Sequence, residues 1–184
     1  NQTDVLEVEY HGEIADYDTR ILPLSVLKGF FGRVSAEPVS FVNAPQLAKE
    51  RGIEVRERST STSHDFVNLL TVRDGTSAVS GTLAGLRGEA RLVMVDDHKV
   101  DVPPARHMLV VRNEDVPGVI GLVGTVLGDA GLNIADMDVG QTADGTAALM
   151  VLALSEPPGE EVLDRLLAAE PIRSVHPISL RQPG

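Results

Sequence analysis

The sequence predicts an α+β protein of two small domains, residues 1–103 and 104–184, from three observations. The chain has 184 residues, which is enough for one ordinary domain or two small ones. Strand-like and helix-like apolar patterns alternate along its length. The segment Val102-Pro103-Pro104-Ala105 interrupts them. Because two prolines hold the chain extended and cannot continue a sheet ladder, this segment suits a short linker.

The first domain is predicted to be a small mixture of strands and helices. It opens with a strand at residues 4–10, where apolar residues alternate with glutamates. Helical spacing follows despite Pro23, and Gly52 suits the end of a second helix. Turn signals at Asp96-Asp97 and at residues 73–75 separate later strands. The predicted helices are residues 19–31 and 43–51, and the other strands are residues 53–58, 66–72, 76–84 and 90–95.

The second domain has the clearer pattern, in the order βαββαβ. After its first strand, Asp115 is a candidate N-cap and Pro117 suits a first helical turn. Gly131 indicates a helix stop, residues 143–145 indicate a hairpin turn, and Pro171 ends the second helix. This order is the split-βαβ or ferredoxin-like arrangement. The predicted strands are residues 107–112, 133–139, 146–154 and 172–180.

Composition restricts the classes of function. Hydrophobic residues make up 42% of the chain but aromatic residues only 3%, so a globular, aliphatic core is expected. The net charge of −11 disfavours a nucleic-acid partner, and the absence of cysteine excludes disulfides and thiolate metal sites. No apolar run reaches membrane-spanning length, so we expect no membrane partner and a cytoplasmic location. The chain begins at Asn1 without a methionine, as a piece of a longer protein would.

The best candidate site joins the segment Asp115-Val-Pro-Gly118 with Asn133. The first N–H groups of the following helix have no intrahelical partner and favour a carboxylate. The Asp115 carboxylate could accept from an ammonium group, and the Asn133 amide offers both a donor and an acceptor. Together they could bind a zwitterion. The alternative is structural, with Asp115 as a helix cap and Asn133 as a turn residue.

A glycine series could be mistaken for a dinucleotide fingerprint. Gly118, Gly121 and Gly124 follow a predicted strand and open a helix, and Asp138 lies about twenty residues beyond, as that fingerprint requires. The first paired glycines are missing, however, and Pro117 occupies the turn. We therefore expect no NAD site in this chain. We expect no metal site, because the five histidines are scattered, and no catalytic residues, because no nucleophile has a plausible base.

Two segments of the second domain resemble a known family. Residues 115–121 (DVPGVIG), followed by residues 130–134 (AGLNI), closely resemble the signature of ACT domains. In the first domain, residues 41–53 and 80–85 resemble the intervening domain of long-form D-3-phosphoglycerate dehydrogenases. The resemblance covers the whole chain. It implies that catalytic and NAD domains precede this region in the parent enzyme, and that NAD is a cofactor there but not here.

The resemblance also implies an effector, L-serine, acting by feedback inhibition at an interface between two ACT domains of a homo-oligomer. Asp115 would hold the ammonium of serine, and the backbone around Val116 and Gly118 would hold its carboxylate. Asn133 would reach across from the neighbouring subunit. Asn113 stands where some relatives have an aromatic residue, which is a departure that bears on serine affinity.

The first domain is a candidate for binding an anion, since domains of this type are associated with a phosphorylated or anionic effector. Arg91 is the first candidate for a phosphate contact, with Arg87 nearby. Arg56, Arg58 and His64 flank a Ser/Thr run. The alternative is a solvent-exposed strand edge whose charges disfavour pairing with strands of other chains.

Three other functions stay open on the sequence alone. The chain could be an oligomerisation module without a ligand. It could be the regulatory part of another amino-acid enzyme, such as an iron–sulfur L-serine dehydratase, which can carry related domains. It could also be a free-standing enzyme, although no catalytic constellation is evident.

Overall fold

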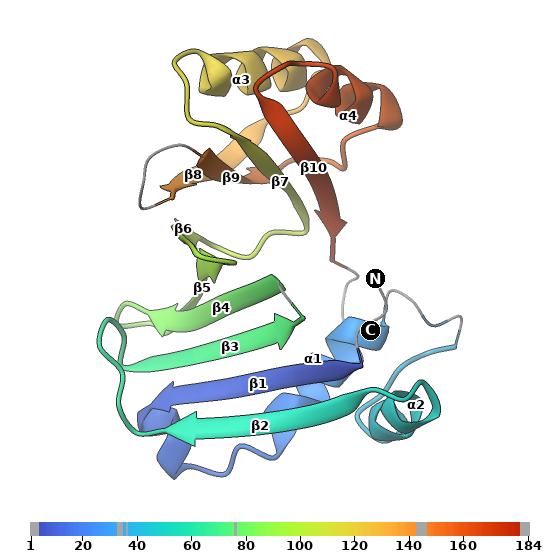
Figure 1. Ribbon diagram of the computed structural model, residues 1–184, viewed down its shortest axis with the longest axis vertical. Coiled ribbons are helices and arrows are strands. Elements are labelled where there is room, and N and C mark those ends of the chain that lie inside the picture. Colours follow the sequence, from blue (N-terminus) through green and yellow to red (C-terminus); the bar gives the residue numbers. More distant parts are fainter. Residues whose placement is uncertain (1–3, 33–34, 36, 76, 143–146, 181–184) are drawn as a thin grey trace. The chain divides into compact units, whose positions relative to one another are not determined.

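The described residues of the computed structural model form an α+β protein, as the sequence predicts (Figure 1). The chain divides into two compact units, Asn1–Leu83 and Ala84–Gly184. Within the described residues, the first unit holds four strands and two α-helices, and the second holds six strands and two α-helices. The described residues are 4–32, 35, 37–75, 77–142 and 147–180.

The first unit is a four-stranded arrangement with helices on one face. Its strands are ordered β2-β1-β3-β4, with β1 parallel to β2 and antiparallel to β3. The second helix ends where expected, because Gly52 takes a φ of 69°, which glycine adopts most easily. The elements are β1 (Val5–Gly12), a 3-10 turn (Glu13–Asp16), α1 (Ile21–Phe31), α2 (Ala44–Glu50), β2 (Glu54–Thr60), β3 (Asn68–Asp74) and β4 (Ser77–Ala84).

The two faces of this first sheet differ in chemistry. On one face, apolar side chains of β1 pack against both helices, and the buried cluster is Leu6, Leu27, Phe31, Ala44, Ala48 and Ile53. The other face is polar. There the Glu9 carboxylate accepts from Arg73, and the buried hydroxyls of Thr71 and Ser80 bond each other at 2.8 Å. These polar contacts explain why burial alternates along β1.

The second unit contains the predicted βαββαβ order. Its four-stranded antiparallel sheet has the order β10-β7-β9-β8, and α3 and α4 lie on one face (Figure 1). The hairpin turn predicted at residues 143–145 lies outside the described residues. The elements are β7 (His107–Glu114), α3 (Val119–Asp129), β8 (Ile134–Gln141), β9 (Ala147–Leu154), α4 (Glu160–Leu167) and β10 (Ile172–Ser179).

A β-hairpin covers the other face of this second sheet. It joins β5 (Glu89–Val95) to β6 (His98–Val102) through the predicted turn, where Asp96 has a φ of 54°. β6 was not among the predicted strands, because it has only five residues, precedes two prolines and has three polar residues. Its apolar cluster is Val95, Val100, Val102, Met108, Val110, Leu149 and Val151.

The hairpin bears on where the chain divides. Sequence analysis put the domain boundary at residues 103 and 104, whereas the compact units divide after Leu83. The difference is the hairpin, which packs on the second sheet through the apolar residues of β6. The predicted domain boundary between residues 103 and 104 therefore stays a prediction.

Candidate functional site

The loop from β7 to α3 is held in a defined turn. The Glu114 N–H donates to the Pro171 carbonyl at 2.9 Å, and the Glu114 carboxylate pairs with Arg173 of β10. Gly118 takes a φ of 95°, a left-handed conformation that side chains with a Cβ rarely adopt. The loop therefore turns sharply just before the helix.

Gly118, not Asp115, is the N-cap of α3. The helix begins at Val119, and no side chain caps it. The predicted capping role of Asp115 was wrong, because the left-handed turn at Gly118 shifts the start of the helix four residues beyond the aspartate. Two consequences follow. The Asp115 carboxylate does not cap the helix, and among the described residues no side chain caps the N–H groups of the first turn of α3.

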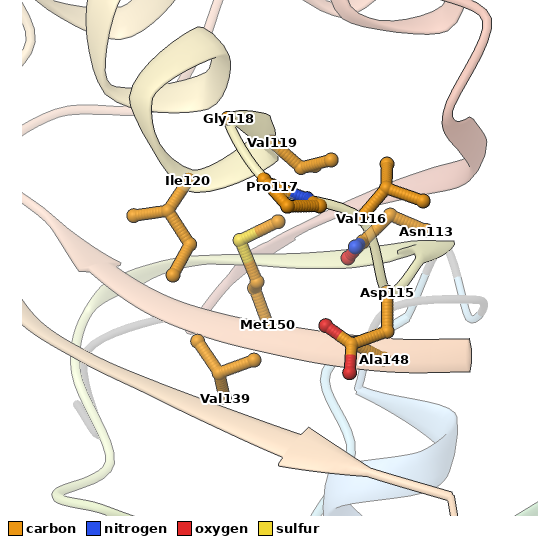
Figure 2. A pocket seen from close by; sticks show the side chains of 10 residues that line it. All are labelled: Asn113, Asp115, Val116, Pro117, Gly118, Val119, Ile120, Val139, Ala148 and Met150. Carbon is orange, nitrogen blue, oxygen red and sulfur yellow. The ribbon is translucent and has the colours of Figure 1, made fainter. Parts of the chain in front are cut away.

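A pocket of about 390 Å³ lies below this loop and the first turn of α3 (Figure 2). Most of its lining is apolar, and the sheet forms its floor. Pockets of this size, mostly apolar with a few polar groups, are typical of small-molecule sites. The lining residues are Asn113, Asp115, Val116, Pro117, Gly118, Val119, Ile120, Val139, Ala148 and Met150.

Strand register builds the floor of the pocket. Ala148 of β9 pairs with Asn113 of β7 on one side and with Gln141 of β8 on the other. In the neighbouring row, Met150 pairs with Val139. Because paired residues of antiparallel strands point to the same face, both rows face α3. The small Ala148 between two carboxamide residues leaves room above the sheet.

Asn113 is the most unusual group in the pocket. The residue is only 4% exposed, and its Nδ2 donates to the Glu114 carbonyl at 2.7 Å. Its buried Oδ1 has no hydrogen-bond partner among the described residues. A buried acceptor without a donor costs about 1–3 kcal/mol. A ligand with a suitably placed donor would remove that cost.

Asp115 lies at the edge of the pocket and is only partly exposed. Its Oδ2 accepts a hydrogen bond of 2.6 Å from the Nε2 of Gln141 at the end of β8. Sequence analysis did not single out Gln141. The signal was available, since period-two alternation along this strand puts Gln141 on the same face as Val139.

Asn133 does not join Asp115 within one chain. It is exposed and lies beyond the far end of α3, a helix whose 11 residues span about 16 Å. There its backbone N–H donates to the Ser155 hydroxyl at 3.1 Å, and its carbonyl accepts from the Ser155 N–H at 3.0 Å. Its predicted effector role therefore requires a second copy of the chain, and it stays a prediction.

Three of the five basic residues predicted to bind an anion have carboxylate partners. The Arg91 Nε donates to the Asp101 Oδ1 at 2.6 Å, and this hydrogen bond raises the pKa of the Arg91 guanidinium. On β2, Arg56 pairs with Glu54 at 2.8 Å and Arg58 with Glu7 at 3.4 Å.

An anion would have to compete with these carboxylates for the three guanidinium groups. Arg87 and His64 are exposed, and they lie in different units of the chain. The anion site therefore remains a prediction, and the charged strand edge stays its alternative.

In the described parts of the chain, no three His, Asp or Glu side chains form a group that could hold a metal ion. None of the helices within those residues is long and apolar enough to cross a membrane.

The fold and the pocket define the class of the second unit. The βαββαβ order makes it a ferredoxin-like domain, and residues 107–171 match the family described as "ACT domain". Residues 1–96 match "D-3-phosphoglycerate dehydrogenase intervening domain", which covers more than half of the chain. The chain therefore belongs to the family of the D-3-phosphoglycerate dehydrogenase intervening domain, followed by an ACT domain.

Individual relatives agree with both matches. The chain is 33% identical over 182 residues to a D-3-phosphoglycerate dehydrogenase of Synechocystis sp., covering 96% of this chain and 33% of that protein. It is 34% identical over 180 residues to the enzyme of Mycobacterium leprae, covering 95% and 34%. The Bacillus subtilis enzyme is 33% identical over 177 residues, covering 94% and 34%. The chain spans about a third of the length of these relatives.

Proposed function

We propose that this chain is the regulatory region of a D-3-phosphoglycerate dehydrogenase and that its pocket binds L-serine as a feedback effector. The parent enzyme would oxidise 3-phosphoglycerate with NAD, the first step of L-serine biosynthesis, in the cytoplasm. The family membership supports the parent activity. The observation that carries the effector is the pocket itself, where the unpaired Asn113 Oδ1, the Asp115 carboxylate and the uncapped start of α3 converge.

Each polar group of the pocket suits one part of a small amino acid. The carboxylate of Asp115 would accept from the ligand's ammonium group. The backbone around Val116 and Gly118, with the first N–H groups of α3, would bind the ligand's carboxylate. The Asn113 Oδ1 would accept from the hydroxyl of serine, satisfying a buried group that is otherwise unpaired.

We propose further that two chains pair through their ACT domains and that the effector lies at the seam between them. β8 is an edge strand of its sheet, and Val116 and Ile120 are about half exposed beside the pocket. Asn133 of the second chain would then complete the site. Serine would act by favouring one arrangement of the subunits, with a coupling free energy of about 1–3 kcal/mol.

Thermal unfolding of the 184-residue chain against the twenty amino acids tests the effector. L-serine at a hundred times its dissociation constant should stabilise the chain by about 2.7 kcal/mol. L-alanine has no hydroxyl and should stabilise it less. The variants Asp115→Ala and Asn133→Ala should lose the serine effect, and Arg91→Ala, whose side chain is bound to Asp101, should keep it.

The same experiment separates the alternatives. If no amino acid raises the midpoint, a ligand-free oligomerisation module becomes the better explanation. If serine binds, the sequence upstream in the parent gene distinguishes two kinds of enzyme. A nucleotide fingerprint there indicates the dehydrogenase, and a cysteine cluster indicates an iron–sulfur L-serine dehydratase.

A further inference from the structure

The end of β8 places a second carboxamide beside the pocket. Gln141 is the last residue of that strand, and it pairs with Ala148 on the floor of the pocket. Asn113 pairs with Ala148 from the opposite side. The floor thus carries two carboxamides separated by one methyl group, and they differ in their hydrogen bonds. The Asn113 amide is directed to its own loop, whereas the Gln141 amide reaches Asp115.

The hydrogen bond from Gln141 involves only one of the two oxygens of the Asp115 carboxylate. The Gln141 Nε2 is 2.6 Å from Oδ2, within hydrogen-bond distance of that oxygen. A carboxylate has two oxygens and about four acceptor positions. With Oδ2 occupied, Oδ1 remains for a further donor.

This contact also supports the loop from its less restrained side. On the β10 side, the loop is held through Glu114, whose N–H bonds Pro171 and whose carboxylate pairs with Arg173. Gln141 joins the loop to β8, the edge strand on the other side of the sheet. Removing its amide would therefore free the Asp115 side chain and the residues just before α3, without altering the core.

We infer that Gln141 is a positioning residue of the effector site, which orients the Asp115 carboxylate for a ligand with a primary ammonium group. The inference rests on the proposed function. Gln141 acts through Asp115, so its effect on ligand binding exists only while residue 115 can accept its hydrogen bond.

A double-mutant cycle tests this dependence. Gln141→Leu keeps the size of the side chain but removes the donor, and Asp115→Ala removes the acceptor. L-serine should bind about fivefold more weakly to Gln141→Leu, as expected for one net hydrogen bond. In the Asp115→Ala background, where residue 115 has no side-chain acceptor, Gln141→Leu should cause no further loss of the residual serine affinity. Gln46→Leu is the matched control, because Gln46 donates to the Glu50 carboxylate at 2.9 Å on α2, far along the chain.

Amide hydrogen exchange of the ligand-free chain provides the second measurement. Gln141→Leu should speed exchange at residues 115–119 by about fivefold, and Gln46→Leu should leave it unchanged. Unchanged exchange, or additive losses of serine affinity in the cycle, would overturn the inference. A wild-type chain that binds no amino acid would refute the proposed function instead, and the exchange measurement separates that outcome from a failure of the Gln141 contact alone.

Discussion

The two sheets of this chain have strands of similar length but are buried in different ways. Along β1 in the first unit, buried residues alternate with partly exposed ones, because one face packs on helices and the other is polar. In the second unit, all residues of β9 after the first are buried. Helices α3 and α4 cover one of its faces and the β5–β6 hairpin covers the other. The difference shows that the burial pattern of a strand reports how many of its faces are apolar.

The comparison also explains where the pocket lies. In the second unit, helix α3 begins only at Val119, so the sheet rows at Ala148 and Met150 are covered by a loop at this end. The floor of the pocket belongs to a sheet that is held from both faces. A rigid floor below a loop suits ligand binding, since binding groups gain from a fixed scaffold.

The largest expected effect tests whether the hairpin truly covers the second face. Leu149 is fully buried in the hairpin cluster, so Leu149→Ala should lower the free energy of unfolding by about 2–5 kcal/mol. Urea unfolding followed by circular dichroism measures the change. Leu167→Ala on α4 is the control, because Leu167 is 48% exposed and should lose much less. Equal, small losses would mean that Leu149 faces solvent.

A glycine of β8 tests how closely the hairpin approaches. A Cβ on Gly140 would lie 2.5 Å from the Lys99 carbonyl oxygen and 3.0 Å from the His98 Cβ. Because backbone atoms cannot turn aside, Gly140→Ala should lower the free energy of unfolding by about 1–3 kcal/mol. Urea unfolding again measures it, and a neutral result would contradict the close packing of β6 on β8.

The third substitution is expected to raise the free energy of unfolding, whereas the first two lower it. A Cβ on Gly128 of α3 would meet open space, so Gly128→Ala should raise the free energy of unfolding by about 1 kcal/mol through helix propensity. Thermal unfolding measures this gain. If Gly128→Ala instead lowered the stability of a concentrated sample but not of a dilute one, Gly128 would lie at a contact between copies of the chain.

The smallest effect at neutral pH belongs to the first unit. Tyr10 is 2% exposed and donates to Glu57 at 2.9 Å, so burial and the nearby carboxylate raise its pKa. Its neutral form is favoured in the folded state. The resulting stability is present below the ordinary tyrosine pKa of about 10 and is lost as the pH rises above it. Tyr10→Phe should cost about 1 kcal/mol at neutral pH and should reduce the alkaline loss.

Both tyrosines of the chain lie in the first unit, which makes the measurement specific. Tyrosinate absorbance followed against pH should show Tyr10 ionising only as the unit unfolds. Ionisation of Tyr10 in the folded chain would contradict its burial.

Sequence patterns predicted most of the fold because they record local requirements. Gly52 and Gly131 end helices with positive φ, and the strand predicted at residues 146–154 is found as β9. The same patterns could not predict β6, because three of its five residues are polar. Its apolar residues pack on the second sheet, and this contact lies outside any local pattern. For the site, Asp115 and Asn113 were predicted to bind the effector, and both line the pocket.

The sequence by itself determined the two-part α+β organisation, the βαββαβ order and the loop in which the candidate site lies, since these depend on periodicity and turn residues close together in the chain. Only the tertiary structure decided which strands share a row on the floor of the pocket. It also decided that Gln141 meets Asp115 and that the Asn113 Oδ1 is buried with no hydrogen-bond partner among the described residues. Such facts depend on strand register and on burial, and both arise from contacts between residues distant in sequence.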